Sequence, residues 1–410
     1  MNRSATKSEV GRATDRLVRL AYARLVAWLA SEWHDVAAAE DALGDALRAA
    51  LEAWPRTGIP ERPEAWLLVA ARRRLLDAVR ARRVRAAAMG ELESLAEPAA
   101  PAPPPVPDRR LALLFVCTHP VIDEGVRTPL MLQTVLGLDA ARIASCFLVA
   151  PATMGQRLVR AKARLRDAGT RFVVPEPDAF PARAVAVREA IYAAYGTGWD
   201  ALGTTDPVCR GLTDEAIWLA RVLVETLPDD AEAKGLLSLM LFCESRRQAR
   251  RSQEGRFVPL AEQDPALWER TMVTEAEALL TAAVGVGDAG RFQLEAAIQS
   301  AVVDGARTGR PPRQAILALH TALVAVAPTI GNALARIAAL ADVAGAEAGL
   351  AALTALPEAT VATYQPYWAV RAHLLRLSGD EADAQAAYER AAALTDDPAV
   401  RAFLLGRTSH

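Results

Sequence analysis

The chain has 410 residues, of which 52% are hydrophobic and 23% charged, and its formal net charge is −2. This composition excludes a disordered chain, and the near-neutral total by itself argues against a nucleic-acid binder, whose surface is usually basic. Helix-forming Ala, Leu, Arg and Glu are abundant, whereas β-branched runs with a period of two are nearly absent. The sequence therefore predicts an all-α protein with several domains.

Several other classes of protein are disfavoured. The chain has no run of about 18 apolar residues and its start is polar, so we expect neither a membrane span nor a secretory signal, and predict a cytoplasmic protein. Its four cysteines form no CxxC pair, which favours buried reduced thiols over a metal site. Motifs of hydrolases, P-loops and dinucleotide-binding enzymes are missing, so we predict no catalytic residues and no cofactor.

Charge is distributed unevenly along the chain. Residues 1–171 hold 26 basic and 19 acidic residues, a net charge of +7, whereas residues 172–410 carry a net charge of −9. The positive charge is concentrated in residues 62–85 and 142–171, each with a net charge of +6. Such asymmetry indicates that the first part of the chain meets a polyanion.

The first predicted domain, residues 10–90, is helical. One helix is expected to be capped by Asp35, to run to about Trp54 and to end at Pro55. A later helix has an expected apolar face formed by Trp66, Val69, Ala70 and Leu76. Its expected polar face is formed by Arg72, Arg73, Arg80 and Arg83. These arginines form either an ordinary solvated surface or a surface that binds the phosphates of a nucleic acid, since Arg binds phosphate with paired hydrogen bonds.

A linker rich in Pro and Ala, residues 91–107, precedes a second predicted domain, residues 108–172. There a short helix capped by Asp139, a turn and a helix that begins at Pro151 predict a helix-turn-helix. The second helix has an expected buried stripe of Met154, Leu158, Ala161 and Leu165. Its opposite stripe, expected to bind DNA, consists of Thr153, Gln156, Arg157, Arg160 and Arg164. Gln can pair with adenine and Arg with guanine or phosphate, whereas a helical hairpin that binds nothing is the alternative.

Residues 173–410 are predicted to form paired helices, as in a domain of tetratricopeptide-like (TPR-like) repeats. The clearest pair carries a pattern of small and aromatic residues at Trp368, Ala372, Gly379, Ala384, Tyr388 and Ala391. Weaker pairs are expected over residues 213–247, 267–303 and 315–353. Residues 253–259 are typical of an inserted loop or hairpin. Stacked pairs present a concave surface for a protein, a peptide or part of the same chain, or serve only as a scaffold.

These features together resemble a known family. The segments 35–46, 65–77 and 152–166 are similar to regions two and four of the extracytoplasmic-function sigma factors of bacteria. The segments 114–120 and 156–162 are similar to the subgroup that has a TPR-like C-terminal extension. The resemblance implies two small helical sigma domains, region two and a helix-turn-helix region four, on a Pro-rich linker, followed by the repeat domain.

The resemblance also implies an alternative sigma factor, which binds core RNA polymerase, recognises promoter DNA and initiates transcription under regulation by its C-terminal domain. The polymerase would meet Asp35, Glu40, Asp41 and Asp45. The downstream promoter element would meet Arg72, Arg73, Arg80, Arg82 and Arg83. The upstream element would meet Thr153, Gln156, Arg157, Arg160 and Arg164. For Asp35 an interaction with the helix dipole explains the residue equally well. Two other functions stay open: a helix-turn-helix regulator that does not bind polymerase, and a TPR-type protein-binding scaffold.

Overall fold

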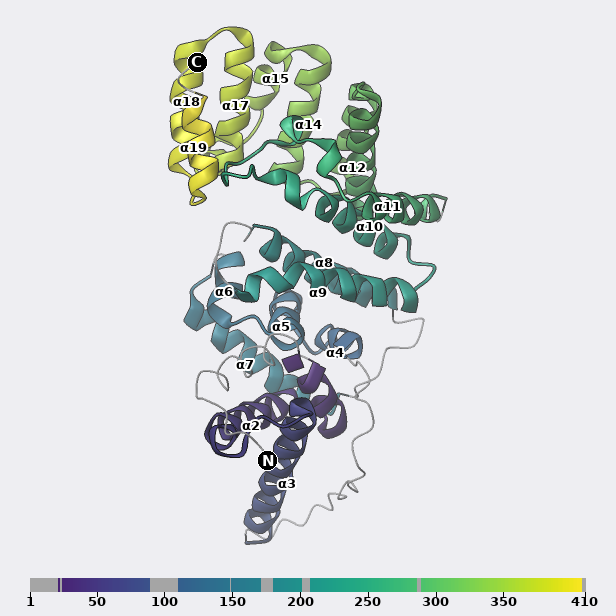
Figure 1. Ribbon diagram of the computed structural model, residues 1–410, viewed down its shortest axis with the longest axis vertical. Helices are drawn as coiled ribbons and strands as arrows, with labels where there is room; N and C mark the ends of the chain where they lie inside the picture. The colour runs from purple at the N-terminus through teal and green to yellow at the C-terminus, as the bar shows by residue number, and fades with distance from the viewer. Residues whose placement is uncertain are drawn as a thin grey trace. The chain divides into compact units, whose positions relative to one another are not determined.

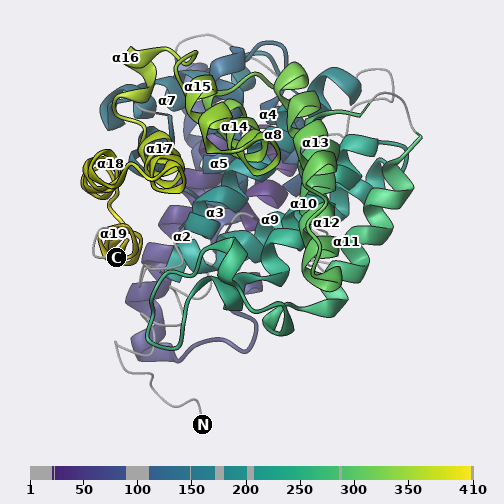
Figure 2. The ribbon, with the colours of Figure 1, turned by 90° about the horizontal axis from the view of Figure 1, so that it is seen from above.

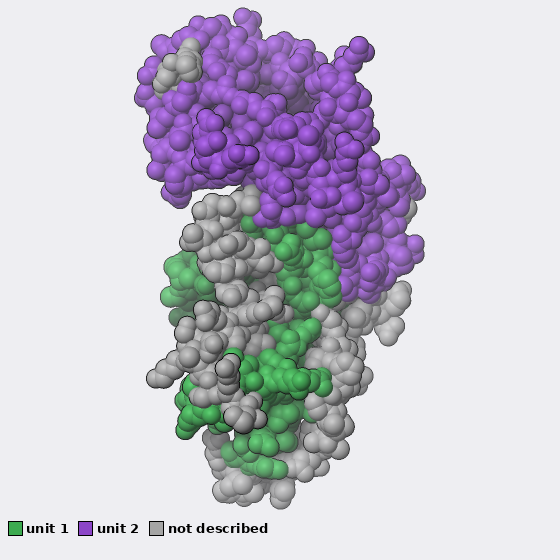
Figure 3. Space-filling model, viewed as in Figure 1, with its two compact units in different colours: residues 1–219 green, residues 220–410 purple. Residues whose placement is uncertain are grey.

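The computed structural model describes residues 21–22, 24–88, 110–147, 149–170, 180–200, 207–285 and 289–407. The chain divides into two compact units, residues 1–219 and 220–410 (Figure 3). The described residues form helices joined by turns, and their β structure is limited to one isolated antiparallel bridge. The predicted all-α class is confirmed. Within these residues no helix is both long and apolar enough to cross a bilayer.

Unit 1 begins with a small group of helices. Residues 24–33 are helical and precede α2 (Val36–Thr57) and α3 (Pro63–Ala88), which pack on each other (Figure 1). The carboxylate of Asp35 accepts a hydrogen bond from the Ala38 amide at 3.0 Å. The predicted cap of this helix is therefore confirmed, and it satisfies one of the amides that a helix start leaves unpaired.

The end of α2 corrects the prediction that this helix stops at Pro55. The helix continues to Thr57, with Pro55 inside its last turns. A proline there has no N–H to donate, so one hydrogen bond of the helix is lost, yet the helix continues for two residues beyond it. The chain then leaves the helix at Gly58, which has φ 83° and whose amide donates to the Trp54 carbonyl at 2.9 Å. A glycine favours this end point because it adopts positive φ at little cost.

The buried face of α3 is also different from the predicted one, which was Trp66, Val69, Ala70 and Leu76. Among the side chains of α3 that the structure describes, residues 63–81, the buried ones are Leu67, Leu68, Ala71 and Leu75. Val69 is 43% exposed, and Trp66 lies at the border, where its ring meets the Trp54 ring edge-on with centroids 5.4 Å apart. Six apolar residues follow one another over positions 66–71, so apolar spacing alone does not determine which face is buried.

The second group of helices in unit 1 follows. Helices α4 (Arg110–Cys117) and α5 (Glu124–Leu136) pack on each other, and α6 (Ala140–Cys146) packs on α7 (Pro151–Asp167). Helix α5 contacts both α6 and α7, so it holds the pair in place. The bounds of α6 and α7 agree with the two helices and the intervening turn that the sequence predicted.

Helix α8 (Phe180–Asp200) packs on α4 and α5. The boundary between the two units falls inside α9 (Pro207–Thr226). These contacts associate α8 with the helices before it. The expectation that a separate domain spans residues 173–410 stays a prediction.

Unit 2 is an array of helices in which each helix packs mainly on helices one or two places away in the chain. After α9 come α10 (Ala231–Ser245), α11 (Arg270–Ala283), α12 (Arg291–Thr308), α13 (Arg313–Val326), α14 (Ile330–Ala344), α15 (Ala346–Leu353), α16 (Glu358–Val361), α17 (Gln365–Ser378), α18 (Glu381–Ala393) and α19 (Pro398–Gly406). The last three helices lie side by side (Figure 2).

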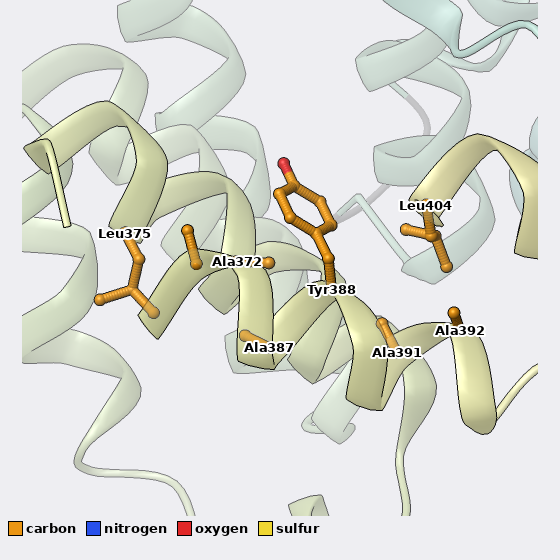
Figure 4. Close-up of a cluster of buried hydrophobic side chains, with 8 residues drawn as sticks. Ala372, Leu375, Ala387, Tyr388, Ala391, Ala392 and Leu404 are labelled. Atoms are coloured by element: carbon orange, nitrogen blue, oxygen red, sulfur yellow. The ribbon is translucent and has the colours of Figure 1, made fainter. Parts of the chain in front are cut away.

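The last helices of unit 2 bury the pattern of small and aromatic residues that the sequence singles out. Helices α17 and α18 bring Ala372, Ala384, Tyr388 and Ala391 into one cluster, which Leu404 of α19 completes (Figure 4). Alanines at the contact let the helix axes approach closely, and Tyr388 fills the remaining space. The predicted pairing of these two helices is confirmed.

An irregular segment, residues 251–264, lies between α10 and α11, and we call it the strap. It crosses from the end of α10 to α19 (Figure 1). The predicted hairpin lies at its start, where Arg251 bridges Phe257 and Gly255 has φ 78°. The contacts of the strap with the C-terminal end of the array are the ion pairs Arg251–Asp397 and Glu262–Arg407 and an edge-on ring pair, Phe257–Phe403, with centroids 5.3 Å apart.

Candidate nucleic-acid interface

Helix α7 has one buried and one exposed stripe. It begins with Pro151, whose missing N–H costs no hydrogen bond at the first position of a helix. The buried stripe consists of Met154, Leu158, Ala161 and Leu165, as predicted. The stripe predicted to bind DNA is exposed, and it consists of Thr153, Gln156, Arg157, Arg160 and Arg164. The spacing of three and four between its apolar residues determines this register, so the polar residues between them face solvent.

Local hydrogen bonds hold α6 and α7 in their arrangement. One carboxylate oxygen of Asp139 accepts from the amides of Ala141 and Arg142, at 3.0 and 2.9 Å. In the turn, the Val149 amide donates to the Ala144 carbonyl at 3.1 Å. Helices α6 and α7 thus pack on each other as a helical hairpin, the arrangement in which a second helix can present side chains to a groove of DNA.

The basic residues of the exposed stripe differ in their surroundings. Arg164 donates to Asp123, just before α5, at 2.8 Å. Within the described part of the chain, no carboxylate lies within ion-pair distance of Arg157 or Arg160. The cationic groups best placed to meet an anion are therefore Arg157 and Arg160, in the middle of the helix.

Arg72 of α3 is engaged inside its own helical group. Its Nε donates to Glu32 at 3.1 Å, and its guanidinium lies 4.8 Å from the centroid of the Trp28 ring. The side chains of Arg72 and Glu32 are only 17% and 20% exposed. This arginine joins α3 to the helix of residues 24–33, and the sequence gives no sign of it because the partners are 40 positions apart.

The other arginines of α3 are more exposed. Arg73 and Arg80 face solvent, and the Arg80 guanidinium lies 3.8 Å from Asp77. Arg74, which the sequence analysis did not select, is exposed beside Arg73. Arg82 and Arg83 continue the helix, but their side chains lie outside the described residues. Among the described side chains, Arg73 and Arg80 are therefore the exposed members of the set predicted to bind the downstream promoter element, and Arg74 adds a third exposed arginine.

Three of the four carboxylates predicted to bind polymerase form hydrogen bonds or ion pairs within the chain. Asp35 caps the helix, and Asp45 bonds to an arginine one turn further along. Glu40 forms an ion pair with Lys162 of α7. Asp41 is exposed. Of the four carboxylates predicted to bind polymerase, Asp41 is therefore the one that faces solvent most openly.

The pair of Glu40 and Lys162 is largely shielded from water. The two side chains are 17% and 11% exposed. Burial raises the pKa of Glu40, and the positive charge of Lys162 opposes that rise. Tyr22 lies in the same surroundings, where its own burial and the charges of Glu40 and Asp41 raise its pKa to about 12. The Glu40–Lys162 ion pair joins residues that are 122 positions apart, so no local sequence pattern predicts it.

Cys117 at the end of α4 is fully buried. Its Sγ lies 3.3 Å from the Thr134 hydroxyl, and burial raises the pKa of the thiol to about 12. A thiol with that pKa stays protonated near neutral pH and is a poor nucleophile. This agrees with the expectation of a buried structural thiol.

Comparison with known proteins adds two similarities. A family model described as "Family of unknown function (DUF6596)" matches residues 183–284, from α8 through the strap to the end of α11. Over 388 residues the chain is 35% identical to "Uncharacterized protein R00370" of Rhizobium meliloti (strain 1021), which covers 91% of this chain and 89% of that protein. No solved structure matches the chain.

Proposed function

This chain belongs to one family with the Rhizobium meliloti protein, and we propose that it is an alternative sigma factor, which binds core RNA polymerase and directs it to promoter DNA. The observation that carries the proposal is the exposed stripe of α7. Gln156, Arg157 and Arg160 lie on the exposed face of a helix whose other face is buried against the neighbouring helices. Side chains of these types read base edges in the major groove and bind phosphates.

The charge of the chain supports the same proposal. Residues 142–171 carry a net charge of +6, and the exposed arginines of α3 add a second basic surface in the same unit. Phosphate contacts of this kind provide much of the affinity of a protein for DNA and weaken as salt rises. Two basic surfaces in one unit suit a protein that contacts two separate promoter elements.

For unit 2 we propose a TPR-like regulatory domain. Its support is the array of helices that pack on helices one or two places away in the chain, together with the small-residue contact between α17 and α18. In this role unit 2 changes the activity of the N-terminal helices and makes no base contacts of its own, in keeping with the net charge of −5 over residues 220–410, which hold 18 basic and 23 acidic residues.

The direct test is transcription in vitro with purified core RNA polymerase and the full chain. DNA fragments that the mixture transcribes are selected from bacterial genomic DNA. We expect transcripts with a common upstream and downstream sequence. Polymerase that pulls down with the chain but never initiates would refute the proposal, as would a chain that does not bind core polymerase at all.

The α7 surface is tested on the DNA so selected. Replacing Arg157 and Arg160 by Ala removes two cations, and each lost base contact costs about 1–3 kcal/mol of binding free energy. Arg166→Ala is the matched control, because Arg166 lies in the last turn of α7 beside Asp167 and is outside the predicted stripe. Equal promoter affinity for the double variant and the control would mean that α7 does not read the DNA.

A helix-turn-helix regulator that does not bind polymerase is the second candidate. The observation that favours it is the occupation of Asp35, Glu40 and Asp45 by contacts within the chain. Asp41→Lys distinguishes the two candidates, with Glu52→Lys at another exposed site on α2 as its control. A sigma factor loses affinity for core polymerase only in the first variant, whereas the regulator binds specific DNA and never the polymerase.

A further inference from the structure

Helices α2 and α7 contact each other within unit 1, although they belong to different helical groups. The contact contains the ion pair of Glu40 and Lys162, whose side chains are only 17% and 11% exposed. Under the proposed function α2 meets the polymerase and α7 meets the promoter. The two elements that would have to reach different partners are thus held to each other in the free chain.

We propose that the Glu40–Lys162 pair is an autoinhibitory latch, an inference that rests on the proposed function. While the pair is formed, α7 covers the surface of α2 around Glu40. Polymerase can bind this surface only by displacing α7. The displacement also frees α7 to reach the upstream promoter element.

The burial of the pair explains why a partner must replace Lys162 and cannot simply be added. A carboxylate that is 17% exposed has little room for a second cation beside the first. Removing Lys162 without replacement leaves a charge in a poorly hydrated place, which is unfavourable. A partner that opens the latch therefore has to bring its own Lys or Arg to Glu40.

Opening is measurable in the free chain by energy transfer between two dyes. Cysteines introduced at Glu52 on α2 and Val159 on α7 place the dyes on exposed positions of the two helices. Cys146, Cys209 and Cys243 are first replaced by serine, and the buried Cys117 is left unchanged. The experiment uses the full chain throughout.

Three variants test the pair itself. Lys162→Glu puts two negative charges together, and we expect most molecules to move from high to low transfer efficiency. The double variant Glu40→Lys with Lys162→Glu rebuilds the pair with reversed charges and should restore the high efficiency. Arg166→Glu changes the charge of α7 by the same amount at its exposed end and should leave the efficiency unchanged.

Two results would overturn the latch. One is a wild-type transfer efficiency in Lys162→Glu, and the other is a double variant that stays as open as the single one. Far-UV circular dichroism checks that each variant is folded. Should Lys162→Glu fail to fold, Lys162→Met removes the charge without adding a new one, and a wild-type transfer efficiency in that variant would overturn the latch.

The link to polymerase is tested with the same proteins. If the open state is about a tenth of the free population, releasing the latch strengthens apparent binding to core polymerase by up to about tenfold. Opening of Lys162→Met without any gain in affinity would refute autoinhibition. Failure of every variant to bind polymerase, including the open ones, would instead refute the proposed function, while the transfer measurements report on the pair independently.

Discussion

Gly235 of α10 lies directly against the backbone of α12, and its replacement by Ala gives a sharp test of the packing of unit 2. A Cβ atom at this position would lie 2.6 Å from the backbone nitrogen of Gln293 and 2.9 Å from the carbonyl carbon of Phe292. Both atoms belong to the backbone of α12, which cannot turn aside as a side chain can. The two helices would have to move apart.

The size of the effect follows from these distances. The new contact is about 1 Å shorter than the separation at which such atoms pack favourably. Overpacking of this kind costs about 1–3 kcal/mol, and replacing a helical glycine by alanine returns up to about 1 kcal/mol. We expect Gly235→Ala to lower the free energy of unfolding of unit 2 by about 1–2 kcal/mol, or its Tm by about 2–8 °C.

Thermal unfolding of the full chain, followed by calorimetry, measures this change. Gly44→Ala is the matched control, because Gly44 is an exposed helical glycine of α2 with no atom within 4 Å of the added methyl group. There the same substitution should stabilise unit 1 by about 0.5–1 kcal/mol. If Gly235→Ala unfolds at or above the wild-type temperature, α10 and α12 do not pack as closely at Gly235 as described.

Three further predictions concern single side chains. Glu232 accepts hydrogen bonds from the amides of Phe292 and Gln293, at 3.0 and 2.9 Å, at the start of α12. Glu232→Gln keeps one acceptor oxygen and should destabilise unit 2 by about 1 kcal/mol in a urea titration. An unchanged urea midpoint would argue against this cap. Burial lowers the pKa of His320. The stability that the neutral imidazole contributes is therefore complete above about pH 6.5 and declines as the pH falls towards the lowered pKa, so His320→Gln should make the free energy of unfolding less dependent on pH in this range. An identical pH profile for the variant would contradict the burial of His320. In a chain whose other cysteines are replaced by serine, Cys117 should react with a thiol reagent only after unfolding, and rapid reaction of the folded chain would show that α4 opens.

Sequence patterns predict well those parts of this fold that depend on neighbours along the chain. The caps at Asp35 and Asp139 involve amides two or three positions away, and both are formed. The register of α7 is correct because Met154, Leu158 and Leu165 are separated by polar residues, which leaves one choice of buried face. Local spacing was sufficient for each of these features.

The parts that the sequence could not predict depend on distant residues or on ambiguous spacing. The apolar run at positions 66–71 allows several faces of α3 to be buried, and contact with α2 decides between them. From the sequence alone, Glu40 and Arg72 each look like ordinary charged residues that face solvent. Their partners, Lys162 and Glu32, are 122 and 40 positions away, so only the folded chain reveals that they are engaged.

The strap gives unit 2 a property that a simple helix array lacks. In such an array each helix depends on its neighbours, so a terminal helix can fray without disturbing the rest. The ion pairs Arg251–Asp397 and Glu262–Arg407 join positions 146 and 145 apart, and thereby couple α19 to the segment that follows α10. Loss of α19 then also releases the strap. We therefore expect unit 2 to unfold in one cooperative step, with amide exchange in α19 slowed to the rate of the helices at the beginning of the array.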